Sequence, residues 1–503
     1  MDVFLGLDFG TTHCKAVAID PGGQVIASAS APTPSHPSSE AGSIEYDADV
    51  LWSVCAHLIG QIIGRLDTDQ RVAGLAVASM GESGVLIDPD GVPLARIPTW
   101  YDHRSVPWAG WWRERLSEAE IYNITGLPLD YIYSANKILW LKEKDPRAFG
   151  RACAWLCISD WLTYCLTGQL TTSYSMASRT MLFDIHRHQW SETMLGLAGL
   201  SPGIMPPALA AGTLAGSVSR EAARRTGLHA GTLVFVGGHD HICAAVAAGA
   251  VEPGIVLDSA GTAEAIMVTL NSPLSGEKMA ASGICCGCHS AKDRYYLLGG
   301  LIAGGVLAWV SRVLMGDDSA ASIDRLMAEA ASSPPGAHGV CFLPYLDGSG
   351  PPDRDPTAWG AWLQLSLQHT RADIARAAVE GISYGIRYLL ETAQDYSGVI
   401  VGELRCVGGG TRNAFWQQVK ADILGLPVDT PSLVDVTAQG AALLSAIGAG
   451  LFRNTADAAS AAYRSGVRYE VDPRRSADYG TAYRAVFQKY YRANKPNRPA
   501  AGQ

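Results

Sequence analysis

The sequence has no block of Lys and Arg residues, and its acidic residues outnumber its basic ones. It contains 48 Asp and Glu against 39 Lys and Arg, which gives a formal net charge of −9 at pH 7. A protein that binds DNA or RNA needs a concentrated set of cations to neutralise the phosphates. Nucleic acid is therefore not expected as a partner, and any attraction for a phosphorylated ligand has to be local.

Long apolar runs and a secretion signal are also missing. No apolar stretch approaches the roughly 20 residues that a membrane-spanning helix needs. The chain starts with Met1-Asp-Val-Phe4, without the basic segment, apolar segment and cleavage site of a signal peptide. We therefore expect a cytoplasmic protein that does not associate with membranes.

Paired cysteine motifs are scarce for a chain with 11 cysteines. The odd number and irregular spacing are typical of reduced thiols in a cytosol. The one dense group is Cys285-Cys-Gly-Cys-His289. A structural zinc site usually joins one Cys pair to a matching second pair, and no matching pair follows this group. We favour unligated thiols over a zinc site here.

The chain is long enough for two domains. Its 503 residues are long for one domain and suit two of roughly 250 residues, each of which can bury a core. The turn at Pro253-Gly254 is the expected boundary. It divides the chain into an N-terminal domain, 1–253, and a C-terminal domain, 254–503.

The first half opens with a hairpin pattern. Leu5-Gly-Leu-Asp-Phe-Gly-Thr-Thr-His-Cys-Lys15 predicts a strand that ends near Asp8, a turn at Gly10, Thr11 and Thr12, and a return strand. Because glycine tolerates positive φ, such a turn can present backbone N–H groups to an anion. Asp8 is placed to hold a cation beside that anion. An ordinary β-hairpin explains this segment alone equally well.

A second copy of the pattern follows about 250 residues later. Ile255-Val-Leu-Asp-Ser-Ala-Gly-Thr-Ala-Glu264 again predicts a strand with an acid, a Gly261-Thr262 turn and a return strand. The repeat suggests two related halves that face each other across a polyphosphate. Each hairpin would then grip one end of it.

The segment Pro98-Thr-Trp-Tyr-Asp-His-Arg104 suits a sugar. Trp100, Asp102 and Arg104 alternate, so in an extended segment they share one face. An aromatic ring can cover the C–H groups of a sugar while an acid and an arginine bind its hydroxyls. An exposed Trp beside a local ion pair is the equally weighted alternative. Glu82 is a further candidate for substrate binding.

Asp240 lies where the predicted strand 233–238 meets an Ala-rich helix. At that junction it is near the positive end of the helix dipole and faces the expected cleft. We predict a role in the chemistry. The alternative is that Asp240 only caps the helix, and the two roles are compatible.

Glycines mark a further candidate region in the second half. Gly304 lies in an apolar segment where the backbone could approach a ligand closely, and Gly408-Gly-Gly410 separates strand 404–407 from helix 413–424. Neither has the G-x-G-x-x-G spacing or the lysine of a P-loop, so each alone is a weak nucleotide signal. The polar tail from Arg464 is expected to fray.

Taken together, these segments resemble the FGGY carbohydrate kinases of the actin-like ATPase superfamily, in the family's order and over nearly the whole chain. The segments that carry the resemblance are Asp8–Thr12, Trp100–Arg104, Ser134–Leu141, Gly238–Asp240, Gly261-Thr262, Gly360–Glu380 and Gly408–Asn413. Gln364 stands where the family usually has Gly, and Ser173 where it often has Asp. Neither departure touches the expected base or the phosphate loops.

The resemblance implies an α/β fold of two related actin-like ATPase (ribonuclease H-like) domains, each a mixed β-sheet flanked by helices, with a cleft between them. It also implies transfer of the γ-phosphate of ATP to a sugar hydroxyl, with Mg²⁺ as cofactor. Asp240 would be the catalytic base, and Asp8 and Asp240 would lie at the metal. The implied sugar-binding residues are Glu82, Trp100, Asp102, Arg104 and Asp240. The implied ATP-binding residues are Gly10, Thr11, Thr12, Lys15, Gly261, Thr262, Gly304, Gly409, Gly410 and Asn413.

The substrate stays open at this point. A ketopentose such as xylulose is the first choice, and gluconate or a polyol such as glycerol are the alternatives. A chaperone or filament ATPase of the superfamily would lack the Trp-Asp-Arg segment and the base. A non-catalytic sugar sensor would be expected to lose Asp8 or Asp240, and both are present. Besides sugar and ATP, a second copy of the chain is an open partner, as a homodimer.

Overall fold

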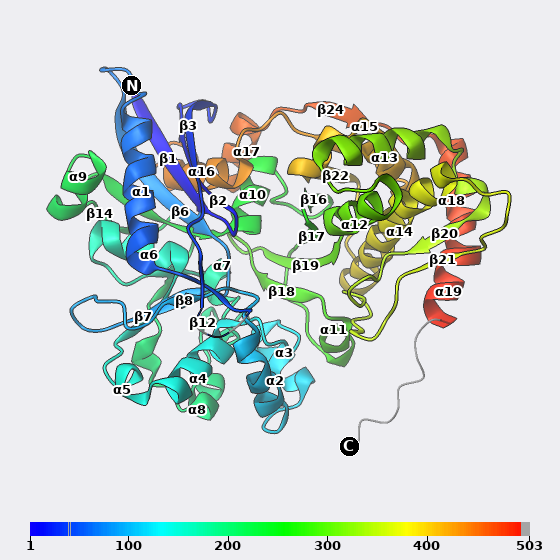
Figure 1. Cartoon of the computed structure of the whole chain (residues 1–503). Helices are drawn as coiled ribbons and strands as arrows, with labels where there is room; N and C mark the ends of the chain where they lie inside the picture. Colours follow the sequence, from blue (N-terminus) through cyan, green and yellow to red (C-terminus); the bar gives the residue numbers. More distant parts are fainter. Residues whose placement is uncertain (39, 41, 494–503) are drawn as a thin grey trace.

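Two α/β domains stand side by side in the computed structural model, which describes residues 1–38, 40 and 42–493 (Figure 1). The first sheet has six strands in the order β14-β15-β6-β1-β2-β3, and the second has seven in the order β18-β19-β17-β16-β22-β23-β24. In each, an antiparallel hairpin is extended by a parallel strand, β6 beside β1–β2 and β22 beside β16–β17. The predicted relation between the two halves is thus visible in their topology.

The strands of the first sheet are β1 (Asp2–Phe9), β2 (His13–Ile19), β3 (Val25–Pro32), β6 (Arg71–Ser79), β14 (Leu214–Ser217) and β15 (Leu233–His239). Those of the second are β16 (Ile255–Ala260), β17 (Ala263–Leu270), β18 (Cys285–Cys288), β19 (Tyr295–Ile302), β22 (Glu403–Val407), β23 (Val428–Thr430) and β24 (Val467–Tyr469). Short strands form small additional sheets: β4 (His36–Pro37), β5 (Ile44–Tyr46), β7 (Gly84–Ile87), β8 (Ile97–Pro98), β9 (Ala154–Cys157), β10 (Thr172–Ser173), β11 (Phe183–Asp184), β12 (Gln189–Trp190), β13 (Ala208–Leu209), β20 (Cys341–Leu343) and β21 (Ala361–Leu363).

The helices before the second sheet are α1 (Ala48–Ile63), α2 (Val106–Arg113), α3 (Glu118–Thr125), α4 (Ser134–Lys144), α5 (Pro146–Phe149), α6 (Ile158–Thr167), α7 (Tyr174–Ala177), α8 (Glu192–Ala198), α9 (Arg220–Thr226) and α10 (Asp240–Ala248). The helices that follow β16 in the chain are α11 (Glu277–Ser282), α12 (Gly304–Met315), α13 (Ala320–Ser332), α14 (Arg371–Ser397), α15 (Ala414–Leu424), α16 (Val436–Gly448), α17 (Thr455–Ala462), α18 (Pro473–Ala482) and α19 (Gln488–Ala493).

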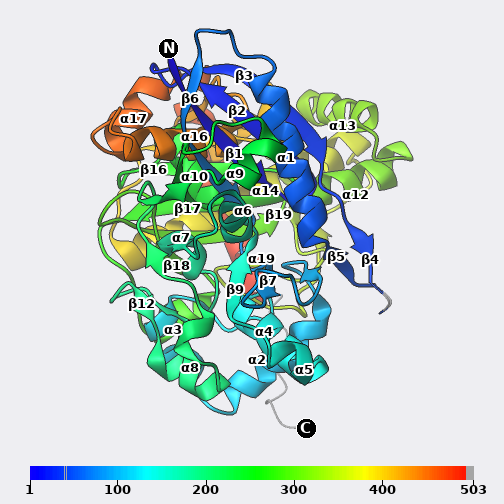
Figure 2. The ribbon, with the colours of Figure 1, turned by 90° about the vertical axis from the view of Figure 1, so that its left-hand side faces the viewer.

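Strand β1 is buried on both faces, and its alternation decides where Asp8 points. Leu5 and Leu7 pack in one core with α1 and α6, and Figure 2 shows α1 over that outer face. Phe4 packs in a different core, with α16. Because side chains alternate along a strand, Asp8 shares the face of Phe4. The sheet therefore directs Asp8 toward the region between the two domains.

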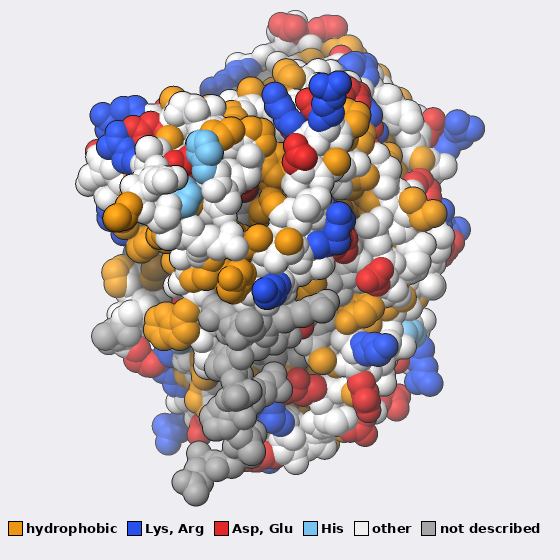
Figure 3. Space-filling view, turned by 90° about the vertical axis from the view of Figure 1, so that its right-hand side faces the viewer, with side chains coloured by type: hydrophobic (Ala, Val, Ile, Leu, Met, Phe, Trp, Pro, Cys, Tyr) orange, Lys and Arg blue, Asp and Glu red, His pale blue; other side chains and the backbone are white. Residues whose placement is uncertain are grey.

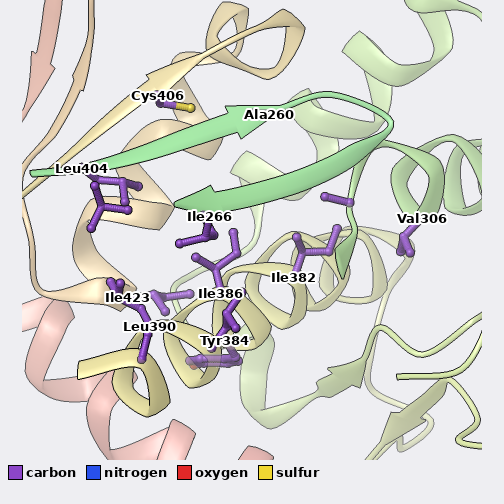
Figure 4. Packing of buried hydrophobic residues seen from close by; sticks show 14 of the residues in the cluster. Ala260, Ile266, Val306, Ile382, Tyr384, Ile386, Leu390, Leu404, Cys406 and Ile423 are labelled. Atoms are coloured by element: carbon purple, nitrogen blue, oxygen red, sulfur yellow. The ribbon is translucent and has the colours of Figure 1, made fainter. Parts of the chain in front are cut away.

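The second hairpin lies on the long helix α14. Figure 4 shows Ile266 of β17 pointing toward Ile382 and Ile386 of that helix, and all three belong to one buried cluster. The helix begins with a capping box in which Thr370 and Asp373 satisfy each other's backbone N–H groups. This cluster holds β16–β17 as a rigid part of the second domain.

Helices α10 and α16 pack between the two sheets. α16 follows β23 of the second sheet in sequence, yet Ala438 and Ala442 share a buried cluster with Phe4 and Val17 of the first sheet. α10 contributes to that cluster and to another with β16 and β17. The boundary at 253/254 stays a prediction, and the packing of α16 and α17 crosses it.

A second zone of contact joins the domains on the side of α3. The hydroxyl of Tyr122 donates to the carbonyl of Ile284 at 3.0 Å, and the carbonyl of Gly126 accepts from Cys286 at 2.7 Å. Arg354 also forms an ion pair with Asp130. Two separate contact zones therefore hold the domains in this arrangement.

The tail is more ordered than the sequence suggested. The expectation of fraying from Arg464 is wrong as far as residue 493, because β24, α18 and α19 form there. Tyr479, Tyr483 and Phe487 are buried and make ring contacts with Tyr384 of α14. These aromatics are spaced for a helix that packs on α14. The Lys495–Pro499 stretch lies outside the described residues.

Charged side chains are mixed over the outer face of the second domain. Figure 3 shows basic and acidic residues interspersed with apolar ones on this face. Within the described residues, no helix combines the length and the apolar character needed to cross a membrane.

Gln364, which stands in place of the usual family glycine, adopts a left-handed backbone with φ of 64°. Its side chain is exposed, so the residue bears the steric cost of that conformation without a packing gain. We predict that the free energy of unfolding of Gln364→Gly is about 1 kcal/mol higher than that of the matched Gln364→Ala. Denaturant unfolding of the two variants measures the difference. Equal stability of the two variants, or the reverse order, would contradict the assignment of strain to this position.

Candidate active site

The first hairpin turn is a tight, internally bonded loop. Gly10 donates its N–H to the carbonyl of His13 at 3.1 Å and accepts the hydroxyl of Thr33 at 2.7 Å. Thr33 in turn donates its N–H to the carbonyl of Thr12. Thr12 itself is exposed and Thr11 is half-buried. The turn is thus held from its carbonyl side.

Asp8 and Asp240 form an acidic pair beside this turn. The Oδ1 atom of Asp8 is buried and has no hydrogen-bond partner, and the side chain of Asp240 is 24% exposed. Burial, and then the charge of Asp240, raise the pKa of Asp8 to about 8, although Lys15 opposes the shift. Burial alone would raise the pKa of Asp240, but the neighbouring histidines and the backbone N–H of His241 lower it. The two carboxylates, close together and of unlike pKa, are the ionisable centre of the site.

Asp240 does not cap its helix. The N-cap of α10 is His239, and Asp240 is the first helical residue, with Oδ1 accepting the N–H of His241 at 2.6 Å. The capping alternative from the sequence is therefore wrong. His239 lies with Nε2 3.3 Å from Asp240, and burial lowers the pKa of this imidazole to about 3. His239 is thus a neutral neighbour of the carboxylate.

Lys15 is partly engaged by the second half of the chain. Its ammonium lies 2.8 Å from a carboxylate oxygen of Asp435, and its side chain is 36% exposed. Asp435 precedes α16 in a left-handed conformation, with φ of 46°. This ion pair ties β2 to the start of α16, a contact that the sequence did not reveal.

Trp100 connects the predicted sugar segment to the first turn. Its indole Nε1 donates to the hydroxyl of Thr11 at 3.2 Å, and the residue is 36% exposed. The fully buried Lys137 holds this segment by donating to the carbonyls of Trp100 and Ile132. Lys137 was part of the family pattern at 134–141, but nothing in the sequence assigned it this role.

Asp102 and Arg104 are mainly bound to each other. Asp102 is buried and accepts the N–H and the Nε–H of Arg104 at 2.9 and 3.0 Å. Arg104 also pairs with Glu45 at 2.7 Å and lies over the ring of Trp140. This is the local ion pair that the sequence left as an alternative. The structure brings Trp100 to an accessible position but not the carboxylate of Asp102.

Glu82 lies in a buried ion pair with Arg179. The Nε of Arg179 donates to Glu82 at 2.6 Å, while its Nη1 is buried without a partner. Glu82 has a left-handed backbone, with φ of 64°, and such strain clusters at ligand sites. Between Glu82 and Asp240, an added β-carbon at Gly81 would lie 3.0 Å from the ring of His239 and 3.2 Å from Arg179. The Glu82 and Asp240 groups are therefore neighbours.

Arg179 was missed at the sequence level. The stretch 173–180 was not singled out because it is polar and aperiodic, yet it contains α7 and contributes a serine hydroxyl to the same site. Ser175 accepts the backbone N–H of His239 at 3.1 Å. No pattern in the sequence could have indicated that Arg179 faces Glu82.

The second-half candidates also converge. Gly304 donates its N–H to the carbonyl of Gly261 at 3.2 Å, and an added β-carbon on Gly410 would lie 2.7 Å from that of Ala260. Asn413 caps α15 by accepting the N–H of Trp416 at 2.9 Å. Gly261, Thr262 and Gly409 are exposed. The second turn, the start of α12 and the start of α15 thus form one glycine-lined surface.

The cysteine group occupies the edge strand β18. Cys286 and Cys288 are buried, and Cys286 accepts the N–H of Leu274 at 3.5 Å. In the part of the chain that the structure describes, no set of three or more His, Cys, Asp and Glu side chains is arranged to hold a metal ion. The strand instead makes domain contacts, with Cys288 donating its N–H to Ser178.

Known proteins match this chain over most of its length. Residues 3–247 match the model of the N-terminal domain of the FGGY family of carbohydrate kinases, and residues 257–449 match that of the C-terminal domain. The chain is 29% identical to a xylulose kinase of Staphylococcus epidermidis, over 98% of this chain and 97% of that protein. It is 31% identical to an L-fuculokinase of Salmonella typhi, over 90% and 93%.

A solved structure agrees with the fold. The xylulose kinase of Rhodospirillum rubrum is 28% identical and superposes with a TM-score of 0.90, over 97% of this chain and 98% of that one. The fold is therefore the two-domain actin-like ATPase fold that the resemblance implied. This chain belongs to the FGGY family of carbohydrate kinases, phosphotransferases that act on alcohol groups.

Proposed function

We propose that this enzyme transfers the γ-phosphate of ATP to a hydroxyl of a small neutral sugar, with Asp240 as the catalytic base. The observation that carries the proposal is the position of Asp240. Its carboxylate has a lowered pKa, is partly exposed, and lies beside Asp8 at the end of β1. An ionised, accessible carboxylate can accept the proton of an attacking hydroxyl, as phosphoryl transfer requires.

A magnesium ion fits the acidic pair. Mg²⁺ prefers oxygen ligands and usually binds one or two carboxylates together with phosphates. The unpartnered Oδ1 of Asp8 and the closeness of Asp240 both call for a cation at this point. Asp8 and Asp240 would hold it, and it would neutralise charge on the phosphates. The protein contributes the orientation of the two carboxylates.

ATP is assigned to the glycine-lined surfaces. Gly10, Thr11 and Thr12 would meet the phosphates from one side, and Gly261 and Thr262 from the other. The exposed Gly409 and its neighbours Gly410 and Asn413, with Gly304, form the remaining nucleotide contacts in this proposal. Lys15 would contribute its partly exposed ammonium.

The charges at the site favour a neutral sugar over a sugar acid as the substrate. Arg179 is already paired with Glu82, so this arginine is not free to bind the carboxylate of an acid such as gluconate. The hydroxyls of a ketose or polyol need no such cation and can pair with carboxylates. The relatives named above act on xylulose or L-fuculose. We therefore place xylulose first, with Trp100, Glu82 and Asp240 as its contacts and the Asp102–Arg104 pair as their support.

Asp240→Asn should abolish most of the turnover while leaving ATP binding intact. Loss of a general base typically costs about 10²–10⁴-fold in kcat. The amide keeps the size of the side chain and its acceptor for His241, so the fold should be retained. Steady-state kinetics and nucleotide titration measure the two effects. Near-native kcat in the variant would remove Asp240 from the chemistry.

Asp8→Asn should remove magnesium-dependent activity and yet raise the melting temperature of the metal-free protein. The reason is that a buried carboxyl with an unpartnered oxygen lies next to Asp240, so the charge is a cost to the fold. Thermal unfolding and activity assays measure both. The control is Asp2→Asn on the same strand, which breaks only an exposed pair with Arg71 and should change neither. A less stable Asp8→Asn variant that remains active would contradict the proposed metal role.

Gly409→Phe should raise the KM for ATP more than tenfold without changing the KM for the sugar. Outside its chain neighbours, an added β-carbon at Gly409 meets no atom within 4 Å, so a ring fits into this open space, which the proposal gives to the nucleotide. Gly196→Phe is the matched control, because Gly196 is equally open but lies on α8. An unchanged KM for ATP in Gly409→Phe would mean that the nucleotide binds elsewhere.

A further inference from the structure

Three ionisable side chains meet in the interior of the second domain. Lys420 of α15 donates to Asp258 of β16 at 2.7 Å and to Glu264 of β17, and none of the three is exposed to solvent. The ammonium also lies 3.6 Å from the sulfur of Cys406 and over the ring of Trp416. Lys420, Asp258 and Glu264 form a buried triad. Charges taken so completely out of water persist only when they satisfy one another.

The triad spans the turn of the second hairpin. Asp258 precedes Gly261 by three residues and Glu264 follows it by three, so one residue lies on each strand. Each carboxylate keeps one buried oxygen without a partner, and the other oxygen of each accepts from Lys420, which is therefore the cation shared by both acids. Burial, and then the charge of Asp258, raise the pKa of Glu264 to about 8, so one proton and one ammonium offset the two acids at neutral pH.

Asp258 is not the counterpart of Asp8, although the two hairpins look alike in sequence. Asp8 lies two residues before Gly10, whereas Asp258 lies three before Gly261. Because neighbouring residues on a strand point to opposite faces, this single step turns Asp258 away from the side that Asp8 occupies on its own hairpin. The second acid is therefore free to serve the packing of the hairpin.

The same helix that carries Lys420 also carries the glycine segment. α15 starts after Asn413, and its Gln417 donates to the carbonyl of Gly410 at 2.9 Å. An added β-carbon at Gly410 would lie 3.2 Å from the ring of Trp416 and 2.7 Å from the β-carbon of Ala260 in the hairpin. One helix therefore touches the hairpin through Lys420 and the glycine segment through Gln417 and Trp416.

We propose that Lys420 is a positioning residue for ATP, which fixes the distance between the second phosphate turn and the Gly408–Asn413 segment through Asp258 and Glu264. The proposal rests on the proposed placement of ATP on these two segments. Lys420 does not touch the nucleotide. It sets the spacing of the two surfaces that do, so its loss should weaken ATP binding more than sugar binding.

The test is Lys420→Met, which keeps an unbranched side chain of similar size, one atom shorter, and removes its charge. We expect the KM for ATP to rise at least tenfold and the KM for the sugar to change less than twofold. Lys142→Met is the control: Lys142 also donates to two acceptors, here the carbonyls of Ala198 and Gly199, but it lies in the first domain. Equal changes in both KM values, or none, would overturn the proposal.

A second variant covers the case in which Lys420→Met fails to fold. The triple variant Lys420→Met/Asp258→Asn/Glu264→Gln leaves no buried charge unpaired and should fold. Its KM for ATP should still be at least fivefold raised, because no charged contact then fixes the hairpin against α15 and only apolar packing joins the two. A folded triple variant with the native KM for ATP would overturn the proposal.

The Gly409→Phe variant distinguishes a wrong placement of ATP from a wrong role for Lys420. If that variant binds ATP normally, the placement of ATP is wrong. If Gly409→Phe impairs ATP binding and Lys420→Met does not, only the positioning role fails.

Discussion

The site depends on how closely α16 lies against its neighbours. A β-carbon at Gly6 of β1 would lie 1.8 Å from the carbonyl oxygen of Ala438, and one at Gly440 would lie 1.8 Å from that of Cys243 in α10. No side chain fits at either point, so backbone meets backbone. The first sheet, α10 and α16 are thereby held as one unit, and Asp8 and Asp240 stand together as its consequence.

The two hairpins share a topology but use their acids differently. In the first, Asp8 reaches the region between the domains, where its unpartnered oxygen suits a ligand. In the second, Asp258 and Glu264 are buried with Lys420. In the proposed function the chemistry is thus concentrated on the first domain, while the second hairpin offers a backbone turn. A transfer reaction that depends mainly on positioning can use such a division.

Much of this could be predicted from the sequence, because the hairpins and their order are local patterns. The strands around Gly10 and Gly261 are where they were expected, and Asp240 stands at the expected strand-to-helix junction. The pairing of Glu82 with Arg179 was not predictable, since 97 residues separate them and the second lies in an aperiodic stretch. The ion pair of Asp102 and Arg104 is local and was foreseen, but only as an alternative to sugar binding, because the spacing of the two residues fits both roles.

The central claim is that a neutral sugar receives the phosphate. It is tested most directly by measuring ADP release from ATP and Mg²⁺ with xylulose, L-fuculose, glycerol or gluconate added in turn. The account predicts that a neutral sugar stimulates ADP release, that phosphorylated sugar forms in equal amount, and that gluconate stimulates least. ADP release that no sugar increases, or that gluconate increases most, would contradict it.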